Sequence, residues 1–342
     1  MTELVDAAQL TAWAQDRLPG EGPVEVERLQ AGHSNLTFVV RRNDREYVLR
    51  RPPQGPLLPT AHDVVREYRV LDLLRRADTG VRVPEVVAVC EDTGVIGVPF
   101  YVMAKVEGDV VRDALPAWLS EDRRRDVGLD LVQALAEIHS APYQPFVDAG
   151  IGRAAGYLER QVRRWRGQRE GMLAAGGGRD LPDYDAVSAW LGDHLPQDAG
   201  DPALVHGDFK LDNVILDPGS ARIAAVVDWE MATVGDPLAD LGYLLSFWVE
   251  PGESVPFLGD AAVTAQPGWP TRQDLADHYA ELTGRRMTDL RFYVTLAVWK
   301  LAILLEASYH RHLAGTTDDP FFAMLETGVP ALLARARENC GA

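Results

Sequence analysis

Cysteine is almost absent from this chain of 342 residues, which contains only Cys90 and Cys340. The two cysteines lie far apart, and neither belongs to a Cys-x-x-Cys pair or to another spacing typical of a metal site. This scarcity argues against a disulfide framework and predicts a protein of the reducing cytoplasm.

Long apolar runs are missing as well. The most apolar helix-like run, residues 292–305, has fourteen positions and contains Lys300, so it is too short to span a bilayer and predicts a buried core helix. The first ten residues, MTELVDAAQL, are acidic and lack the basic region and apolar core of a signal peptide. We therefore expect a cytoplasmic protein without a membrane partner.

Basic side chains are outnumbered, since 34 Lys and Arg residues face 51 Asp and Glu residues and give a net charge of −17. This balance argues against a surface for nucleic acid or anionic membranes, and the sequence indicates no obligate protein partner. Lysine is the rarest basic residue, because only Lys105, Lys210 and Lys300 occur among the 34. The absence of lysine from a given site is therefore weak evidence against a function there.

Two nucleotide-binding signatures are also missing. The chain has no G-x4-G-K-[ST] sequence and no G-x-G-x-x-G after a predicted strand, so P-loop and dinucleotide-binding proteins lose their main support. What the chain does have is a length that suits one large or two ordinary domains and a hydrophobic content of 46%, which is enough to build their cores.

Hydrophobic periodicity divides the chain into two regions. Alternating and β-branched runs predict five strands near the N-terminus, with one segment of helical spacing at 62–76 between the third and the fourth. The predicted strands are 24–30, 36–42, 46–51, 83–90 and 98–106. The predicted fold class is α+β, with a small antiparallel β N-lobe that contains one helix (1–103) and a larger, mainly helical C-lobe (104–342).

Helical spacing dominates the second region. The expected helices lie within 125–141, 235–248 and 273–310. The segment 174–185 is rich in glycine and proline and is expected to be a loop. Short apolar runs around the turn sequence DPGS predict a β-hairpin within 203–228.

The stretch LVHGDFKLDNVILDPGSARIAAVVDWE (204–230) combines a His-x-Asp, an Asn five positions after that Asp, and a second Asp after the hairpin. Asp208 is placed to accept a proton from an attacking hydroxyl, and the amide oxygen of Asn213 suits Mg²⁺, which prefers oxygen ligands. Asp228 follows a strand-like run, from which its carboxylate would bind the metal directly. Each residue alone has an ordinary structural interpretation, but the ordered set predicts transfer of a metal-chelated phosphate.

HGDFKLDN followed by VVDWE resembles the catalytic loop and metal-binding aspartate of the protein-kinase-like superfamily. With GDPLADLG a few residues later, the chain is similar to the aminoglycoside phosphotransferase family, in particular to the branch also found as a kinase-like domain at the N-terminus of some acyl-CoA dehydrogenases. The resemblance covers roughly residues 20–310. It implies a bilobal protein-kinase-like fold and an enzyme that moves the γ-phosphate of ATP or GTP, with Mg²⁺, to a hydroxyl of a small molecule.

The same resemblance implies the nucleotide contacts. AGHSNLTF (31–38) takes the place of the loop over the phosphates, and Arg50 takes the place of the lysine that faces the α- and β-phosphates. Arginine is always charged but bulkier than lysine, so this substitution has consequences. Glu67 would pair with Arg50, and Lys210 would reach the γ-phosphate as part of the catalytic group. The other residues implied for nucleotide binding are Gly32, Ser34, Asn35, Met103, Ala104 and Val106.

The resemblance implies structural roles for two further residues. Asp240 in GDPLADLG resembles the carboxylate that braces the backbone of the catalytic loop, and His206 would pack beside that loop.

An alternative function is a pseudokinase-type module that binds nucleotide without transfer, which the Arg50 substitution and the single glycine of AGHSNL favour. A metal-dependent hydrolase that uses His206 and the nearby aspartates is a third possibility.

The acceptor is not specified by any motif. The resemblance allows aminoglycosides, macrolides, hydroxyacyl-CoAs, hydroxy acids and other small alcohols. We expect the acceptor site within the helical C-lobe, around 150–200 and 245–315, where acidic residues such as Asp180, Asp183 and Asp185 would suit a cation.

Overall fold

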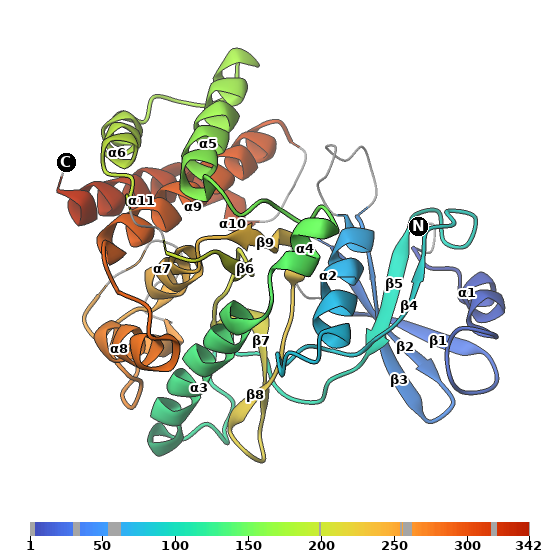
Figure 1. The fold of residues 1–342 in the computed structure, drawn as a ribbon. Coiled ribbons are helices and arrows are strands. Elements are labelled where there is room, and N and C mark those ends of the chain that lie inside the picture. Colours follow the sequence, from blue (N-terminus) through green and yellow to red (C-terminus); the bar gives the residue numbers. More distant parts are fainter. Residues whose placement is uncertain are drawn as a thin grey trace.

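The computed structural model describes residues 4–29, 35–53, 63–197, 200–253, 255, 262–315 and 320–341. These residues form a small lobe built on a β-sheet and a larger helical lobe beside it (Figure 1). The predicted α+β bilobal fold is confirmed.

The sheet of the N-lobe has five strands in the order β1-β2-β3-β5-β4, and all neighbouring strands are antiparallel. Its strands are β1 (Val24–Leu29), β2 (Leu36–Arg42), β3 (Arg45–Arg51), β4 (Val86–Cys90) and β5 (Phe100–Ala104). The β2–β3 hairpin turns at Asn43, whose φ of 55° lies in the left-handed region that asparagine tolerates. Each predicted strand is therefore present, and the boundaries differ by a few residues at most.

Two helices cover opposite faces of this sheet, α1 (Ala7–Ala14) and α2 (Val64–Arg76) (Figure 1). Because side chains alternate along a strand, Phe100 and Val102 of β5 join a buried cluster with Trp13 of α1. Tyr101 and Met103 point the other way and join the core that includes α2. Arg50 pairs with Tyr101 in the sheet, so the same alternation places its side chain on the α2 face.

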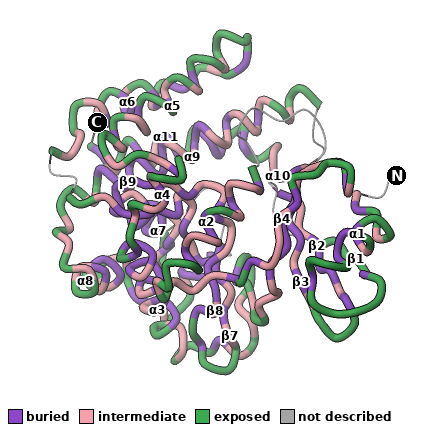
Figure 2. Tube along the Cα trace, turned by 45° about the vertical axis from the view of Figure 1, so that its right-hand side comes forward, coloured by how far each residue is buried: buried purple, intermediate pink, exposed green. Residues whose placement is uncertain are grey.

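The C-lobe contains the remaining helices of the described residues. They are α3 (Glu121–Ser140), α4 (Gln144–Asp148), α5 (Tyr157–Ala174), α6 (Pro182–Asp193), α7 (Leu238–Phe247), α8 (Arg272–Thr283), α9 (Leu290–Leu313), α10 (Pro320–Ala323) and α11 (Leu325–Cys340). Helix α9 packs against α5, α6, α7 and α11, and its buried Phe292, Trp299 and Ile303 confirm the predicted core helix. Figure 2 shows buried positions gathered inside this lobe and exposed ones along its outer turns.

One prediction about this lobe was partly wrong. The segment 174–185 was expected to be a loop throughout, but α6 begins at Pro182. Proline is favourable in the first turn of a helix because its missing N–H would have no helical partner there. The proline that suggested a loop is the residue that starts the helix.

Two small antiparallel strand pairs stand at the inner edge of the C-lobe. Strands β7 (Val214–Asp217) and β8 (Arg222–Val226) form the predicted hairpin, and the carboxylate of Asp217 accepts hydrogen bonds from the turn at Gly219 and Ser220. Strand β6 (Ala203–Val205) pairs instead with β9 (Thr233–Gly235), which the sequence did not predict. The two pairs bracket the stretch 206–213.

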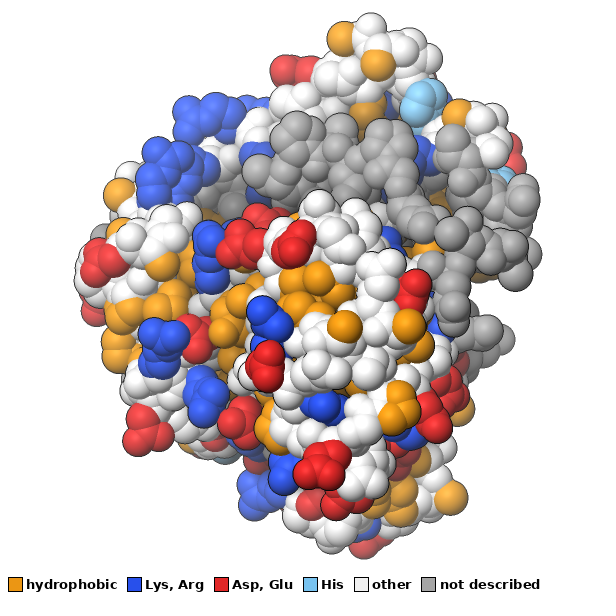
Figure 3. Space-filling model, turned by 90° about the vertical axis from the view of Figure 1, so that its right-hand side faces the viewer, with side chains coloured by type: hydrophobic (Ala, Val, Ile, Leu, Met, Phe, Trp, Pro, Cys, Tyr) orange, Lys and Arg blue, Asp and Glu red, His pale blue; other side chains and the backbone are white. Residues whose placement is uncertain are grey.

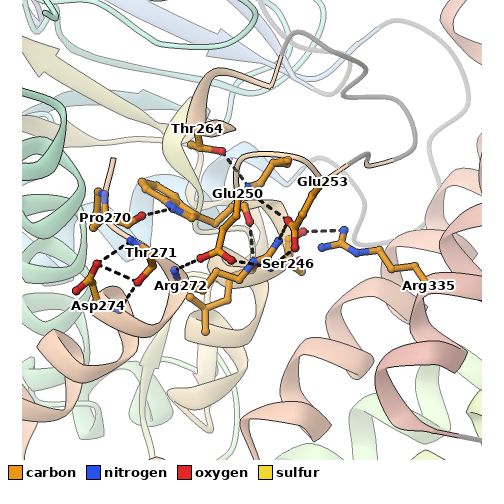
Figure 4. Close-up of polar contacts among 12 residues, drawn as sticks. Ser246, Glu250, Glu253, Thr264, Pro270, Thr271, Arg272, Asp274 and Arg335 are labelled. Carbon is orange, nitrogen blue, oxygen red and sulfur yellow. Dashed lines mark hydrogen bonds and ion pairs between the residues drawn. The ribbon is translucent and has the colours of Figure 1, made fainter. Parts of the chain in front are cut away.

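A polar network joins the residues that follow α7 to the start of α8 (Figure 4). Arg272 donates through Nε to the carbonyl oxygen of Trp248 (2.7 Å), and its guanidinium also pairs with Glu253. From α11, Arg335 donates to the carbonyl oxygen of Ser246 (3.1 Å). These contacts hold the C-terminal end of α7, the helix that carries Asp240.

The described residues contain no helix that is both long and apolar enough to cross a membrane. On the N-lobe face in Figure 3, basic and acidic side chains are interspersed.

Candidate active site

The predicted catalytic loop, residues 206–213, runs from β6 through a short 3-10 turn (Leu211–Asn213) into β7. Asp240 of α7 braces its start, because its Oδ2 accepts from the backbone N–H of His206 (2.5 Å) and its Oδ1 from that of Gly207 (2.8 Å). Burial acts to raise the pKa of Asp240, but hydrogen bonds from His139 and these amides outweigh it, and the pKa lies below its ordinary value. The brace is therefore ionised.

His139 of α3 supports this carboxylate from behind. Its Nε2 lies 3.3 Å from Oδ2 of Asp240, and its Nδ1 lies 2.6 Å from the hydroxyl of Tyr279. Because an ionised carboxylate only accepts, Nε2 donates to Asp240 and Nδ1 accepts from Tyr279. Burial lowers the pKa of His139 and keeps this imidazole neutral. No local pattern in the sequence marks His139 or Tyr279, because each is one polar residue among several in its helix.

Glycine is required at the centre of the His-Gly-Asp sequence. Gly207 has a φ of +84°, and a Cβ there would lie 2.6 Å from the carbonyl oxygen of Met231. Any side chain would therefore be strained by the backbone and would collide with the neighbouring segment. Histidine suits the preceding position, because the imidazole of His206 is fully buried against Trp229 and contacts the carbonyl oxygen of Val227 through Nε2 (3.0 Å).

Asp208 and Asn213 are in direct contact. The Nδ2 group of Asn213 donates to the backbone oxygen of Asp208 and to its carboxylate Oδ2, both at 2.8 Å. With both amide hydrogens directed at Asp208, the Oδ1 atom of Asn213 is left for another partner. The backbone oxygen of Asn213 accepts from the N–H of Val227 (2.9 Å), so the residue is anchored to the strand that leads to Asp228.

Asp228 emerges at the same end of the hairpin, since Val214 pairs with Val226. Its backbone is left-handed (φ 67°, ψ 60°), an unusual conformation for a non-glycine residue. Its Oδ1 accepts from Nη2 of Arg50 (2.7 Å), which leaves Oδ2 for a further ligand. The structure thus brings Asp228 into contact with the N-lobe.

Arg50 joins two carboxylates. Besides Asp228, its Nε lies 3.3 Å from Oε2 of Glu67, which is fully buried on α2. Oε1 of Glu67 accepts from the backbone N–H of Trp229 (3.2 Å). Burial raises the pKa of Glu67, and the guanidinium of Arg50 opposes this effect. The predicted pairing of Arg50 with Glu67 is present in the structure within the N-lobe, and the contact of Arg50 with Asp228 joins the two lobes.

Lys210 lies beside the carboxylate of Asp208. Its Nζ is 3.7 Å from Oδ2 of Asp208 and 3.4 Å from Oδ2 of Asp212, and it lies 5.1 Å from the ring centre of Phe247. Burial acts to lower the pKa of Lys210, but the charges of Asp208 and Asp212 raise it overall. A protonated ammonium is therefore held beside Asp208.

The structure describes only some of the other residues that were predicted to contact the nucleotide. Met103 is buried in β5, and the N–H of Ala104 already donates to the carbonyl oxygen of Glu85 (2.7 Å), which leaves the carbonyl of Ala104 and the N–H of Val106 to meet a base. The side chain of Asn35 donates to Glu230 (3.1 Å). Gly32 and Ser34 lie outside the described residues.

The donor set fits a hard cation. The described residues contain no group of three or more His, Cys, Asp or Glu side chains arranged for a metal ion. Asn213 and Asp228 lie at the same end of the hairpin, and Oδ1 of Asn213 and Oδ2 of Asp228 are not used in the contacts described above. Mg²⁺ is commonly held by one or two protein oxygens, with water and phosphate as the other ligands, and this pair suits it.

The sequence model described as "Phosphotransferase enzyme family" matches residues 25–275. The chain belongs to this family. Acyl-CoA dehydrogenase family member 11 from Homo sapiens is 34% identical over 325 residues, which cover 92% of this chain and 41% of that protein. The chain therefore spans about two fifths of the length of this relative. The predicted likeness to the branch of the family that acyl-CoA dehydrogenases carry is confirmed.

Solved structures of the family agree. A Ralstonia eutropha protein assigned as an aminoglycoside phosphotransferase is 31% identical, with a TM-score of 0.81 and 98% coverage of both chains. The GDP and kanamycin complex of APH(2″)-IIIa covers 96% of this chain and 98% of its own, with a TM-score of 0.63 and 19% identity, and shows the same fold.

Proposed function

We propose that this protein transfers the γ-phosphate of ATP or GTP to a hydroxyl group of a small molecule. The contact between Asp208 and Asn213, beside Asp228 and Arg50, carries this proposal. Asp208 would orient the acceptor hydroxyl and take its proton, and Lys210 would neutralise the phosphate that moves. Mg²⁺, held by Asn213 and Asp228, would spread the charge of the phosphates.

Arg50 would act on the nucleotide in place of a lysine. Its guanidinium already faces Asp228 and Glu67, so it lies where a metal-bound phosphate would approach. The likeness to a structure that contains GDP supports a nucleotide as phosphate donor. The alternative of a pseudokinase-type module predicts nucleotide binding without turnover.

The acceptor is proposed to carry a negative charge, as hydroxy acids and hydroxyacyl-CoAs do. Helix α5, in the expected acceptor region, presents Arg160, Arg163 and Arg164, and no ion pair joins these three to a carboxylate within the described residues. The guanidinium of Arg164 lies 5.3 Å from the ring centre of Trp165. Clustered arginines favour an anion over a polycationic aminoglycoside. Relatives among acyl-CoA dehydrogenase family members support the same choice.

A panel assay tests this proposal. Purified protein is given ATP or GTP with Mg²⁺ and, in parallel, hydroxyacyl-CoAs, hydroxy acids, aminoglycosides or macrolides. We expect acceptor-dependent nucleotide consumption with the first two classes, and a phosphorylated product by mass spectrometry. Nucleotide binding without turnover across the panel would instead favour the pseudokinase-type module, and turnover with aminoglycosides alone would contradict an anionic acceptor.

The Asp208→Ala variant tests the base. We expect transfer to fall below detection while nucleotide affinity stays within about threefold, because Asp208 contacts Asn213 and Lys210 but is not assigned a phosphate contact. Full activity in this variant would remove Asp208 from the proposed role. Isothermal titration with a nucleotide and product formation by mass spectrometry give the two readouts.

A further inference from the structure

Lys300 is a cation in the middle of the apolar helix α9. Its Nζ donates to the carbonyl oxygen of Gly207 (2.9 Å) and lies 5.1 Å from the ring centre of Tyr243 and 5.7 Å from that of Trp165. No ion pair joins it to a carboxylate in the part of the chain that the structure describes. The ammonium group therefore donates to one backbone oxygen and lies near the rings of Tyr243 and Trp165.

This backbone oxygen belongs to the peptide that leads into Asp208. The N–H of Gly207 is held by Asp240 of α7, and its carbonyl oxygen is held by Lys300 of α9. Gly207 has no side chain of its own and a left-handed backbone, so these two contacts are what fixes its orientation. An anion on one helix holds the donor of this residue, and a cation on another helix holds its acceptor.

A cation is a costly choice for this position. Burial lowers the pKa of Lys300, although the charges of Asp208 and Asp240 oppose the shift. Packing alone would be served better by an apolar side chain, since a buried charge loses its hydration. The contact with Gly207 therefore calls for an explanation other than core packing.

We propose that Lys300 is a positioning residue for phosphotransfer: it holds the carbonyl of Gly207 so that Asp208 presents its carboxylate to the acceptor in one direction. This inference rests on the proposed function, because it assigns Lys300 to the same reaction. Lys300 contacts neither the metal ligands nor the residues assigned to the nucleotide. Its loss should therefore slow the chemical step and leave nucleotide binding in place.

Lys300→Met and Lys300→Arg test the proposal, with Arg291→Met as the matched control. Arg291 is a cation on the same helix, but its guanidinium lies over Trp190 (5.5 Å from the ring centre) and not at the catalytic loop. We expect Lys300→Met to lower kcat by about 10- to 100-fold with a nucleotide KM within about threefold of wild type. Lys300→Arg keeps the charge and a donor and should recover much of the loss, and Arg291→Met should match wild type.

Hydrogen–deuterium exchange provides a readout that does not depend on turnover. We expect faster exchange in the peptide that contains residues 204–213 in Lys300→Met and unchanged exchange there in Arg291→Met. Unchanged exchange with a kcat close to wild type in a folded Lys300→Met protein would overturn the proposal, as would equal losses in Lys300→Met and Lys300→Arg. Wild-type protein that binds nucleotide but phosphorylates no acceptor would contradict the proposed function itself, and the exchange result would then decide on the loop contact alone.

Discussion

Arg50 shows what a guanidinium can do that an ammonium cannot. Its Nε faces Glu67 while its Nη2 contacts Asp228, so one side chain pairs with carboxylates on both lobes. Lysine concentrates its charge on a single nitrogen and cannot hold this fork geometry. The chain does contain three lysines, but position 50 carries an arginine. Its planar guanidinium has a more specific geometry than the single charge of an ammonium group.

Arg50→Lys should therefore be harmful although it conserves charge. We expect nucleotide affinity to fall about tenfold, which corresponds to the loss of one charge-assisted hydrogen bond of about 1.5 kcal/mol. Arg41→Lys is the matched control, because Arg41 also pairs with two carboxylates, those of Glu27 and Glu46, but does so at the surface. Equal nucleotide affinity of Arg50→Lys and wild type, measured by titration calorimetry, would show that the fork is dispensable.

At the scale of elements, the N-lobe strands and α2 could be predicted because each carries its own period in consecutive residues. Strand β9 could not, since its three residues are defined only by pairing with β6 some thirty positions earlier. Helix α1 has eight residues and is stabilised by burying Leu10 and Trp13 against the sheet, which is information that only the fold supplies.

The candidate site divides in the same way. Asp208, Asn213 and Asp228 could be found because their order in the chain is specific, and Arg50 and Glu67 because the resemblance pointed to them. Lys300 and His139 act through contacts with loops and helices distant in sequence, so no local pattern marks them. The structure was needed to find these supporting residues.

The backbone of the catalytic loop offers a test at this scale. Gly207 and Gly252 both have left-handed φ values, +84° and +86°, but a Cβ meets the Met231 carbonyl only at Gly207 and nothing within 4 Å at Gly252. We expect Gly252→Ala to cost about 1 to 2 kcal/mol in the free energy of unfolding and to keep full activity. Gly207→Ala should be less stable than Gly252→Ala and should lose transfer. Similar melting temperatures and activities for the two variants would argue against the close approach at Gly207.

At the scale of the whole molecule, the lobes are joined by side chains at the site itself. Arg50 contacts Asp228, Asn35 contacts Glu230, and Arg66 of α2 donates to the backbone oxygens of Glu230 and Ala232. With Glu67, which accepts from the backbone N–H of Trp229, four residues of the N-lobe therefore hold the segment just after β8. A change in the relative position of the lobes must alter the surroundings of Asp228.

His139, which links α3, α7 and α8, contributes to the pH dependence of folding. Its pKa in the folded protein lies below the ordinary value of 6.5, so below that pH the unfolded chain binds a proton that the folded chain does not. The contribution of His139 to the free energy of unfolding should therefore fall as the pH decreases from about 6.5. His139→Gln removes this group and should show a flatter decline in denaturant titrations over the same range. Parallel curves for the two proteins would contradict a neutral His139.

The scarcity of lysine also determines which covalent reagents can label this site. Acylating reagents label nucleotide sites at an uncharged amine, and the strand position opposite Glu67 here carries a guanidinium that stays protonated in water. Within the loop the only amine beside Asp208 is that of Lys210, which is held protonated, and the amine of Lys300 is enclosed by Trp165 and Tyr243. Covalent probes built for the β3 lysine of kinases should therefore leave β3 unmodified, and labelling of Lys210 should be slow because its raised pKa keeps the amine protonated.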